Sequence, residues 1–322
     1  MIGRGEKKMS DSFVHIPVLF EQCMEGLNIK PDGIYVDCTA GGGGHSSGIL
    51  DRLSDKGRLI SLDKDDEALS ECNDKKEKRG AKNWDLVKTD YSKIEDALQS
   101  LNIDKVDGIL ADFGVSSHQI DLPERGFSYA TEGPLDMRMD TTQSLDAYKV
   151  VNTYKEEELA RIFKVYGEER YSGRIAAGIV RDRKVEPFTS TLQLADKIAS
   201  YMPGKGRNEQ QHPARRCFQA IRIEVNNELR SVEELLEAAP RLLNKEGRIA
   251  IITFHSLEDR LVKESFRSLE NPCTCPREFP VCICGKKPVG KVITHKPIVA
   301  DEEENKRNFR AHSAKLRIFE KT

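Results

Sequence analysis

Short apolar runs alternate with longer amphipathic stretches over the first third of the chain. The apolar runs predict strands over Ile34–Cys38, Gly57–Asp63, Asp85–Thr89 and Asp107–Phe113. The stretches between them predict helices over Ser46–Leu53, Asp66–Arg79 and Ser92–Leu101, and a short helix over Phe20–Leu27 precedes the first strand. Strands that alternate with helices predict a parallel α/β sheet covered on both faces. A ligand of such a sheet is expected at the carboxyl ends of its strands.

The alternation stops after Phe113. Residues 119–213 contain turn signals and helical periodicities but no predicted strand, which indicates a helical domain inserted into the sheet domain. The predicted organisation is a flexible extension at residues 1–12, a first part of the sheet domain at 13–118, the insert at 119–213 and a second part at 214–322.

The second part is predicted to complete the sheet. A long helix is expected to carry Phe218, Ile221, Val225 and Leu229 on one face, and a second helix to run to Leu243. A fifth strand is predicted over Gly247–Phe254, with its helix over Leu257–Leu269. Two final strands, Val292–Val299 and Ser313–Phe319, are expected to form an edge pair.

A glycine-rich turn connects the first strand to its helix. Asp37 ends the strand, and Gly41 to Gly44 follow before the helix begins. Glycines let a ligand approach the main chain, and the N–H groups of a helix start favour a carboxylate or phosphate. Asp63 ends the second strand, where an acid commonly accepts hydrogen bonds from ribose hydroxyls. The glycine-rich turn and Asp63 together favour a binding site for a nucleoside-containing cofactor, either a dinucleotide or S-adenosylmethionine. The alternative is that the glycines only form a tight turn.

Two further residues lie where the same ligand is expected. Asp112 ends the fourth strand, where its carboxylate can accept a hydrogen bond from an amine or, alternatively, cap the next turn. Tyr91 follows the third strand, where it can flank an adenine ring or be an ordinary half-buried aromatic residue.

Composition limits the class of protein. The chain has 322 residues, of which 38% are hydrophobic and 32% charged, and its formal net charge is −2. A nucleic-acid-binding surface must therefore be local. No apolar run approaches the ~18 residues that a membrane span needs, and Met1 to Ser10 lack the apolar core of a signal peptide, so a cytoplasmic protein is expected.

Basic residues are concentrated in one region. Residues 170–222 carry 11 arginines and lysines against four acids. Lys205 and Arg207, followed by Arg215 and Arg216, form a basic turn that feeds a helix and is suited to phosphate contacts. A solvated charged face is the alternative.

Eight cysteines in a reducing compartment indicate thiols or metal ligands. Cys273-x-Cys275 and Cys282-x-Cys284 form a compact group, either a metal site or reduced cysteines in a loop, and their spacing is not the C-x₂-C typical of zinc knuckles. The other four cysteines are expected in the core. No metal is predicted in the catalytic site.

Six runs of the sequence match one known family over about residues 13–322. They are Asp37-x-Thr39-x-Gly41-Gly42-Gly43-Gly44-His45-Ser46, Asp112-Phe113-Gly114-Val115-Ser116-Ser117, Glu124-Arg125-Gly126-Phe127-Ser128, Gly133-Pro134-Leu135-Asp136-Met137-Arg138-Met139-Asp140, Tyr166-Gly167-Glu168-Glu169-Arg170 and Phe254-His255-Ser256-Leu257-Glu258-Asp259-Arg260. The chain therefore resembles the bacterial 16S ribosomal RNA (cytosine-N4)-methyltransferases known as RsmH or MraW.

The resemblance implies a class I, Rossmann-like methyltransferase sheet with an inserted helical domain and S-adenosylmethionine as cofactor. It implies that the substrate is a cytidine in the decoding region of 16S rRNA, within the small ribosomal subunit, with no membrane partner; the oligomeric state stays open. The implied cofactor contacts are Gly43, Gly44, His45, Asp63, Tyr91, Asp112 and Gln119. Asp112 is the predicted catalytic residue, with Phe113 stacking on the base.

Two other classes of protein are less consistent with these residues. A nicotinamide-dependent oxidoreductase uses the same kind of sheet, but Gly41 to Gly44 lack the G-x-G-x-x-G fingerprint. A non-catalytic RNA-binding factor on a methyltransferase scaffold is disfavoured by the intact glycine turn, Asp63 and Asp112.

Overall fold

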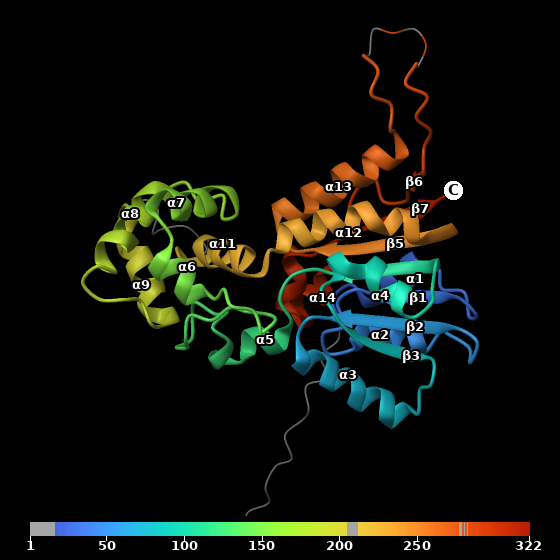
Figure 1. The fold of residues 1–322 in the computed structure, drawn as a ribbon, viewed down its shortest axis with the longest axis horizontal. Coiled ribbons are helices and arrows are strands. Elements are labelled where there is room, and N and C mark those ends of the chain that lie inside the picture. The colour runs from blue at the N-terminus through green and yellow to red at the C-terminus, as the bar shows by residue number, and fades with distance from the viewer. Residues whose placement is uncertain (1–16, 205–211, 277–278, 280, 282) are drawn as a thin grey trace, which may run out of the picture.

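The centre of the structure is a seven-stranded sheet with the order β3-β2-β1-β4-β5-β7-β6 (Figure 1). The computed structural model describes residues 17–204, 212–276, 279, 281 and 283–322. The strands are β1 (Ile34–Asp37), β2 (Arg58–Asp63), β3 (Trp84–Lys88), β4 (Val106–Asp112), β5 (Leu243–Thr253), β6 (Gly290–Val292) and β7 (Lys315–Lys321). Strand β7 is antiparallel to both of its neighbours, whereas β1 to β5 pair in parallel. The predicted Rossmann-like α/β sheet is confirmed.

Helices cover both faces of this sheet because its strands are apolar on both sides. Ile109 and Ala111 of β4 face one core, while Leu110 between them faces the other, as the period of two requires. The first core is covered by α4 (Ile94–Ser100), α12 (Glu228–Leu242) and α13 (Ser256–Glu270). The second is covered by α1 (Phe20–Leu27), α2 (Gly44–Leu50) and α3 (Asp66–Arg79).

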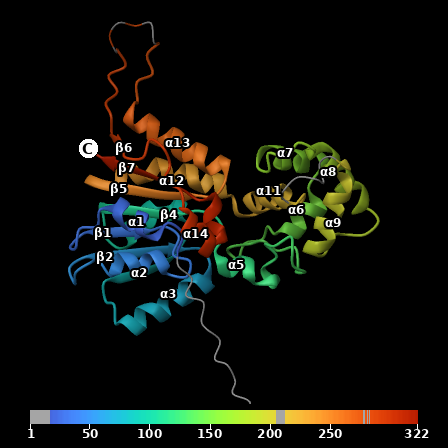
Figure 2. The same cartoon turned by 180° about the vertical axis from the view of Figure 1, so that it is seen from behind.

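The predicted insert forms a helical lobe beside the sheet (Figures 1 and 2). Its helices are α5 (Ser117–Asp121), η2 (Pro123–Arg125), α6 (Ala147–Thr153), α7 (Glu156–Val165), α8 (Ser172–Asp182) and α9 (Thr191–Tyr201). The described residues of the insert contain no strand, and an isolated bridge joins Pro134 to Ser190. A separate hydrophobic core fills this lobe and also takes in α11 (Arg215–Asn226), which lies beyond the predicted boundary at residue 213.

The single long helix predicted through Leu229 is wrong. The helix α11 ends at Asn226, Asn227 adopts a left-handed conformation with φ 53°, and α12 begins at Glu228. Asparagine tolerates this conformation better than most residues. The Asn226 side chain also holds the end of α11 in place, since it accepts a hydrogen bond from Met139 N at 2.8 Å and donates to Met137 O at 2.8 Å.

The predicted strand Val292–Val299 is mostly wrong as well. Strand β6 ends at Val292, and only Ile298 returns to the sheet, as an isolated bridge to Leu316. The reason is that Thr294 Oγ1, rather than a backbone carbonyl, accepts the hydrogen bond from Ile318 N, and Pro297 has no N–H to donate. The predicted pairing at the edge of the sheet is confirmed, because β6 and β7 pair in antiparallel as its last two strands, and α14 (Glu302–Arg307) and η3 (Phe309–Ser313) lie in the long connection between them.

No helix in the described part of the chain combines the length and the apolar character that crossing a membrane requires. The four scattered cysteines, Cys23, Cys38, Cys72 and Cys217, are buried in the cores, as predicted.

Candidate active site

Three carboxylates end adjacent strands at one edge of the sheet. Asp37 is the last residue of β1, Asp63 of β2 and Asp112 of β4, and β1 lies between the other two. Parallel strands bring their carboxyl ends to the same edge, so the sequence-predicted acids are neighbours in space. Figure 1 shows α5, which follows β4, at the end of the sheet nearest the helical lobe.

The glycine turn is tightly packed against its surroundings. Gly41 and Gly43 have left-handed φ angles of 49° and 70°, which favour glycine. A Cβ on Gly44, the first residue of α2, would lie 2.3 Å from Pro17 Cγ. Gly41 N donates a 2.9 Å hydrogen bond to Asp63 Oδ2, so the turn is tied directly to the end of β2.

His45 and Asp112 face each other across this edge. His45 Nε2 lies 3.6 Å from Asp112 Oδ2, and the histidine ring is buried while Asp112 is 25% exposed. The position of Asp112 is fixed by its backbone N–H, which donates to Thr39 Oγ1 at 2.7 Å. The carboxylate therefore stands at a defined place beside the glycine turn.

Asp63 is held in a similar way. Its Oδ1 accepts a hydrogen bond from Asp65 N at 2.9 Å, and its Oδ2 accepts the one from Gly41. Burial raises the pKa of the Asp63 carboxyl, and these two hydrogen bonds only partly oppose the shift. Donors from a ligand, such as hydroxyl groups, would further stabilise its charged form.

Tyr91 and Phe113 form one aromatic pair. Tyr91 begins the 3-10 helix η1 (Tyr91–Lys93), and its ring centroid lies 5.3 Å from that of Phe113. Phe113 is only 2% exposed and belongs to the first sheet core. The prediction that Phe113 stacks on a base is therefore wrong in this structure, because the core already covers its ring.

Gln119 contacts Asp65, in the loop after β2, and not Asp63 or Asp112 themselves. Its amide nitrogen donates to Asp65 Oδ2 at 2.7 Å, and its carbonyl oxygen accepts a hydrogen bond from Ser116 N at 3.0 Å. The side chain thus completes the capping box of α5 and at the same time contacts the loop that follows Asp63.

A buried ion pair that no sequence pattern predicts lies beside Gln119. Arg125 of η2 is buried and donates to Asp65 Oδ2 at 2.8 Å and to Glu67 Oε2 at 2.6 Å. The same guanidinium reaches the carbonyl of Met139 at 3.2 Å. It therefore fastens the start of the helical lobe to the loop after β2. The one signal in the sequence is that Arg125 lies in a run that matches the family.

Asp37 is a further buried acid to which the sequence pattern assigns no role, although it ends a strand. It is fully buried, and Ser46 Oγ donates to its Oδ2 at 2.6 Å, while Ser61 Oγ lies 2.8 Å from Ser46 Oγ. Burial raises the pKa of Asp37 to about 6, against the opposing hydrogen bond from Ser46 and the nearby His45.

The edge has polar atoms that suit a ligand with cationic and donor groups. Among the described residues, Asp112 Oδ1 and both ring nitrogens of His45 are buried without a hydrogen-bond partner. Buried polar atoms in native proteins are nearly always paired, so these atoms point to a role in ligand binding. The carboxylates of Asp63 and Asp112 lie next to the start of α2, an arrangement that fits a nucleoside ligand carrying a positive charge.

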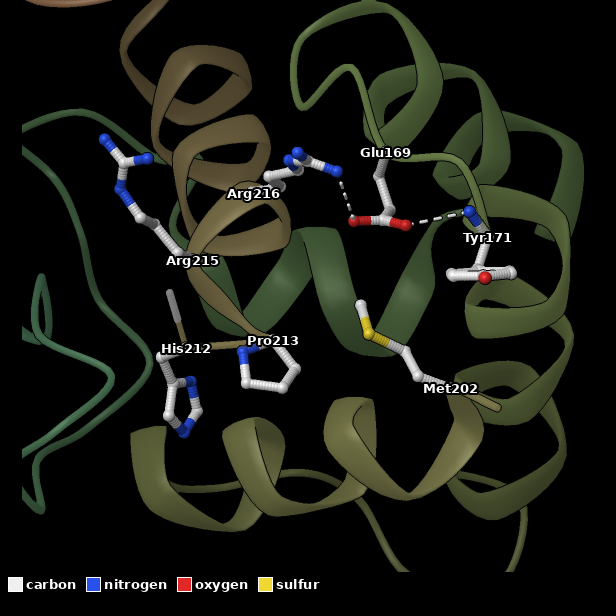
Figure 3. Close-up of a pocket in the computed structure, with 7 residues that line it drawn as sticks. All are labelled: Glu169, Tyr171, Met202, His212, Pro213, Arg215 and Arg216. Carbon is white, nitrogen blue, oxygen red and sulfur yellow. Dashed lines mark hydrogen bonds and ion pairs between the residues drawn. The ribbon is translucent and has the colours of Figure 1, made fainter. Parts of the chain in front are cut away.

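A separate small pocket lies within the helical lobe (Figure 3) and contains none of the seven predicted site residues. Its lining residues are Glu169, Tyr171, Met202, His212, Pro213, Arg215 and Arg216. Arg216 reaches toward the buried Glu169, at 3.9 Å between Nη1 and Oε2, while Arg215 points away from it (Figure 3).

The structure divides the predicted basic region of residues 170–222 into two groups. Some of its cations are bonded within the protein: Arg222 pairs with Glu228 and Arg183 donates to backbone carbonyls, while Arg181 and Lys197 are exposed but pair with Asp182. Others lie on the surface, and these are Arg170, Arg174 and Lys184. Lys205 and Arg207 lie outside the described residues.

Comparisons with known proteins decide the family. Residues 12–322 match the family model described as the MraW methylase family. The chain belongs to this family. It is 54% identical over 309 residues to the ribosomal RNA small subunit methyltransferase H of Carboxydothermus hydrogenoformans, covering 96% of this chain and 98% of that protein. The protein of the same name from Clostridium botulinum (strain Loch Maree) is 52% identical, with 96% and 99% covered.

Among solved structures, an rRNA methylase from Streptococcus thermophilus matches with a TM-score of 0.41 and 10% identity, covering 94% of this chain and 93% of that one. Membership of a methylase family identifies the sheet as a class I methyltransferase fold and the chain as an enzyme that uses S-adenosylmethionine. Neither the oxidoreductase nor the non-catalytic factor is supported.

The buried Asp37 generates a pH-dependent prediction. Its folded pKa of about 6 lies above the unfolded value of about 3.9, so its contribution to stability is complete below the unfolded pKa and is lost as pH rises through the folded pKa. In the variant Asp37→Asn, the amide at this position does not titrate. We expect the free energy of unfolding of the variant, relative to wild type, to increase by about 2 kcal/mol between about pH 4.5 and about pH 8.

Urea unfolding of both proteins at a series of pH values measures this difference. The shared titration of all other groups cancels between the two proteins. Asp96→Asn, an exposed acid on α4, is the matched control and should show no such trend. If the free energy of unfolding of Asp37→Asn differs from that of wild type by the same amount at every pH, the pKa of Asp37 is not raised in the folded protein.

Proposed function

We propose that this chain transfers a methyl group from S-adenosylmethionine to the N4 amine of a cytidine in the decoding region of 16S rRNA. Relatives more than 50% identical over nearly the whole chain are named small-subunit rRNA methyltransferases, so rRNA of the small subunit is the substrate class. The observation that carries the amine assignment is Asp112, a partly exposed carboxylate with one buried, unpartnered oxygen beside the glycine turn.

The residues that would hold the cofactor surround Asp112. Gly43, Gly44 and His45 provide the start of α2 for the carboxylate end of the cofactor, following the general anion preference of helix starts. Asp63 would accept hydrogen bonds from the ribose hydroxyls. Tyr91 would flank the adenine, and Gln119 would position the loop after β2. The cofactor supplies an electrophilic methyl group bound to a sulfonium.

The chemical task left to the protein is mainly one of alignment and charge. The lone pair of cytosine N4 is conjugated with the ring, which makes the amine a poor nucleophile. An in-line displacement requires N4 to be held in a fixed direction, and Asp112, anchored through Thr39, offers an acceptor at a fixed place. Positive charge that develops on N4 would be stabilised by this carboxylate, which can also take up the proton that leaves the amine.

The target base must leave its stack to reach the site, which costs least in single-stranded or loop RNA. We place the reaction within the small ribosomal subunit, and therefore in the cytoplasm. The basic residues of the helical lobe would hold the phosphate backbone. The contact between Glu168 and Arg260, at 3.3 Å, brings the run Tyr166–Arg170 next to α13, which begins just after β5.

Cofactor affinity should depend on Asp63. Asp63→Ala should weaken S-adenosylmethionine binding by on the order of 2–3 kcal/mol, because the variant has no anionic acceptor for the two hydroxyl groups. Titration calorimetry on the purified protein measures the change. Asp66→Ala, an exposed acid on the following helix, is the control and should bind normally. Unchanged affinity in folded Asp63→Ala would remove Asp63 from the site.

The rate of methyl transfer should depend on Asp112. Asp112→Ala should slow the transfer by at least ~10²-fold, the size expected when one group that stabilises developing charge is removed. The assay is single-turnover transfer to 16S rRNA at saturating cofactor, so that weaker cofactor binding does not affect the rate. Asp96→Ala on α4 should react at the wild-type rate. A near-normal rate for Asp112→Ala would mean that another group accepts the charge.

Binding of rRNA should depend on Arg215. Arg215→Ala should weaken binding, and removal of one phosphate interaction should flatten the dependence of log K on log salt by ~0.7. The change leaves Arg216 and its buried partner Glu169 in place, so the fold should be retained. Lys78→Ala on α3 removes the same charge from an exposed position on the sheet domain and should leave the slope unchanged. Equal slopes for wild type and Arg215→Ala would show that this arginine binds no phosphate.

A further inference from the structure

A long loop projects from the sheet domain between α13 and β6. It leaves α13 after Glu270 and returns at Gly290 as two extended arms that run side by side (Figures 1 and 2). Its described residues contain no helix or strand. Loops of this length without secondary structure are uncommon in compact domains, and they are usually either functional or linker segments.

Three cysteine side chains converge across the two arms. Cys273 and Cys275 lie on the outgoing arm and Cys284 on the returning arm, and their Sγ atoms all lie within 4.8 Å of one another. A tetrahedral zinc ion with Zn–S bonds of about 2.3 Å separates its sulfurs by about 3.8 Å. The observed thiols therefore need to close by only roughly 1 Å to share one metal ion.

A hydrogen bond directed at one sulfur supports a shared metal site. Ile283 N, on the returning arm, donates to Cys275 Sγ on the outgoing arm at 3.3 Å. Donors aimed at sulfur orient a ligating thiolate and partly neutralise its charge. The bond also crosses between the arms, at the position where a shared ion would join them.

Hydrophobic burial does not hold these arms together. The apolar residues near the tip are exposed, with Phe279 at 47%, Val281 at 70% and Ile283 at 74%. A loop with no core needs another cross-link to keep one shape. Lys286 and Lys287 closely follow the cysteines, and their charges would balance the net negative charge of a zinc ion with three thiolates.

We infer that Cys273, Cys275 and Cys284 bind one Zn²⁺ ion that fixes the shape of this loop. Binding replaces three S–H bonds by three Zn–S bonds and releases three protons to solvent. Thiolates select zinc over magnesium or calcium, which take oxygen ligands. The site lies at the β6 edge of the sheet, whereas the candidate active site is formed by the ends of β1, β2 and β4, so the ion has no part in methyl transfer. The sequence has a fourth thiol at Cys282, which lies outside the described residues, and the inference does not rest on it.

The direct test is metal content. Full-length protein purified without chelator, exposed to zinc and dialysed, should contain one zinc per chain by plasma mass spectrometry. The single variants Cys273→Ser, Cys275→Ser and Cys284→Ser should each lose most of it. Cys217→Ala, which removes a buried thiol from the helical lobe, should retain it. Circular dichroism confirms that each variant is folded. Zinc-free wild type, or full retention by the three variants, would overturn the inference.

A second measurement separates zinc from a disulfide. In the zinc-bound protein, chelator alone should expose thiols to a thiol reagent and should speed tryptic cleavage after Lys286, because the two arms are released. Cobalt substitution should give sulfur-to-cobalt charge-transfer bands in wild type and weaker ones in the serine variants. Thiols that appear only after a reductant is added, in protein without zinc, would show that the cysteines are cross-linked to each other and that no metal site exists.

Discussion

The buried ion pair between Arg125 and Asp65 is the interaction on which the arrangement of the two lobes depends. Arg125 belongs to the start of the helical lobe, and Asp65 belongs to the loop that follows Asp63 at the end of β2. The same Asp65 oxygen accepts a hydrogen bond from Gln119, and Asp65 N donates to Asp63. Removal of one partner from a buried pair typically costs about 3–5 kcal/mol, because the other charge is left uncompensated. One network therefore links the position of Asp63, the proposed ribose-binding residue, to the attachment of the start of the helical lobe.

The protein has an acidic edge at the strand ends and a basic region in the helical lobe, and electrostatics explain why both are needed. The edge with Asp37, Asp63 and Asp112 concentrates negative charge, which suits a cofactor that carries a sulfonium and an ammonium group. The same edge would repel the phosphates of RNA. An enzyme that acts on RNA therefore needs cations elsewhere, and we propose that the surplus in residues 170–222 supplies them although the chain as a whole has a net charge of −2.

Local signals in the sequence predict the sheet and much of its functional edge. Short apolar runs mark β1 to β5, and the helices Phe20–Leu27 and Asp66–Arg79 occur as predicted. Because strand ends determine where side chains lie in a parallel sheet, Asp63 and Asp112 are also predictable from position alone. The break at Asn227 and the early end of β6 are not, because each depends on a side chain that hydrogen-bonds to a distant segment. The Arg125–Asp65 pair joins residues 60 positions apart, and no local pattern marks such a contact. The roles of the individual site residues and the domain boundaries stay predictions.

The proposal that Asp112 holds the amine acceptor is tested most directly by the product of the reaction. Purified protein is incubated with small ribosomal subunits, or with 16S rRNA, and S-adenosylmethionine that carries an isotopically labelled methyl group. The RNA is then digested to nucleosides, which are analysed by mass spectrometry. Transfer to the N4 amine predicts label in N4-methylcytidine. Label on carbon 5 of cytidine, on the ribose or on another base would contradict it.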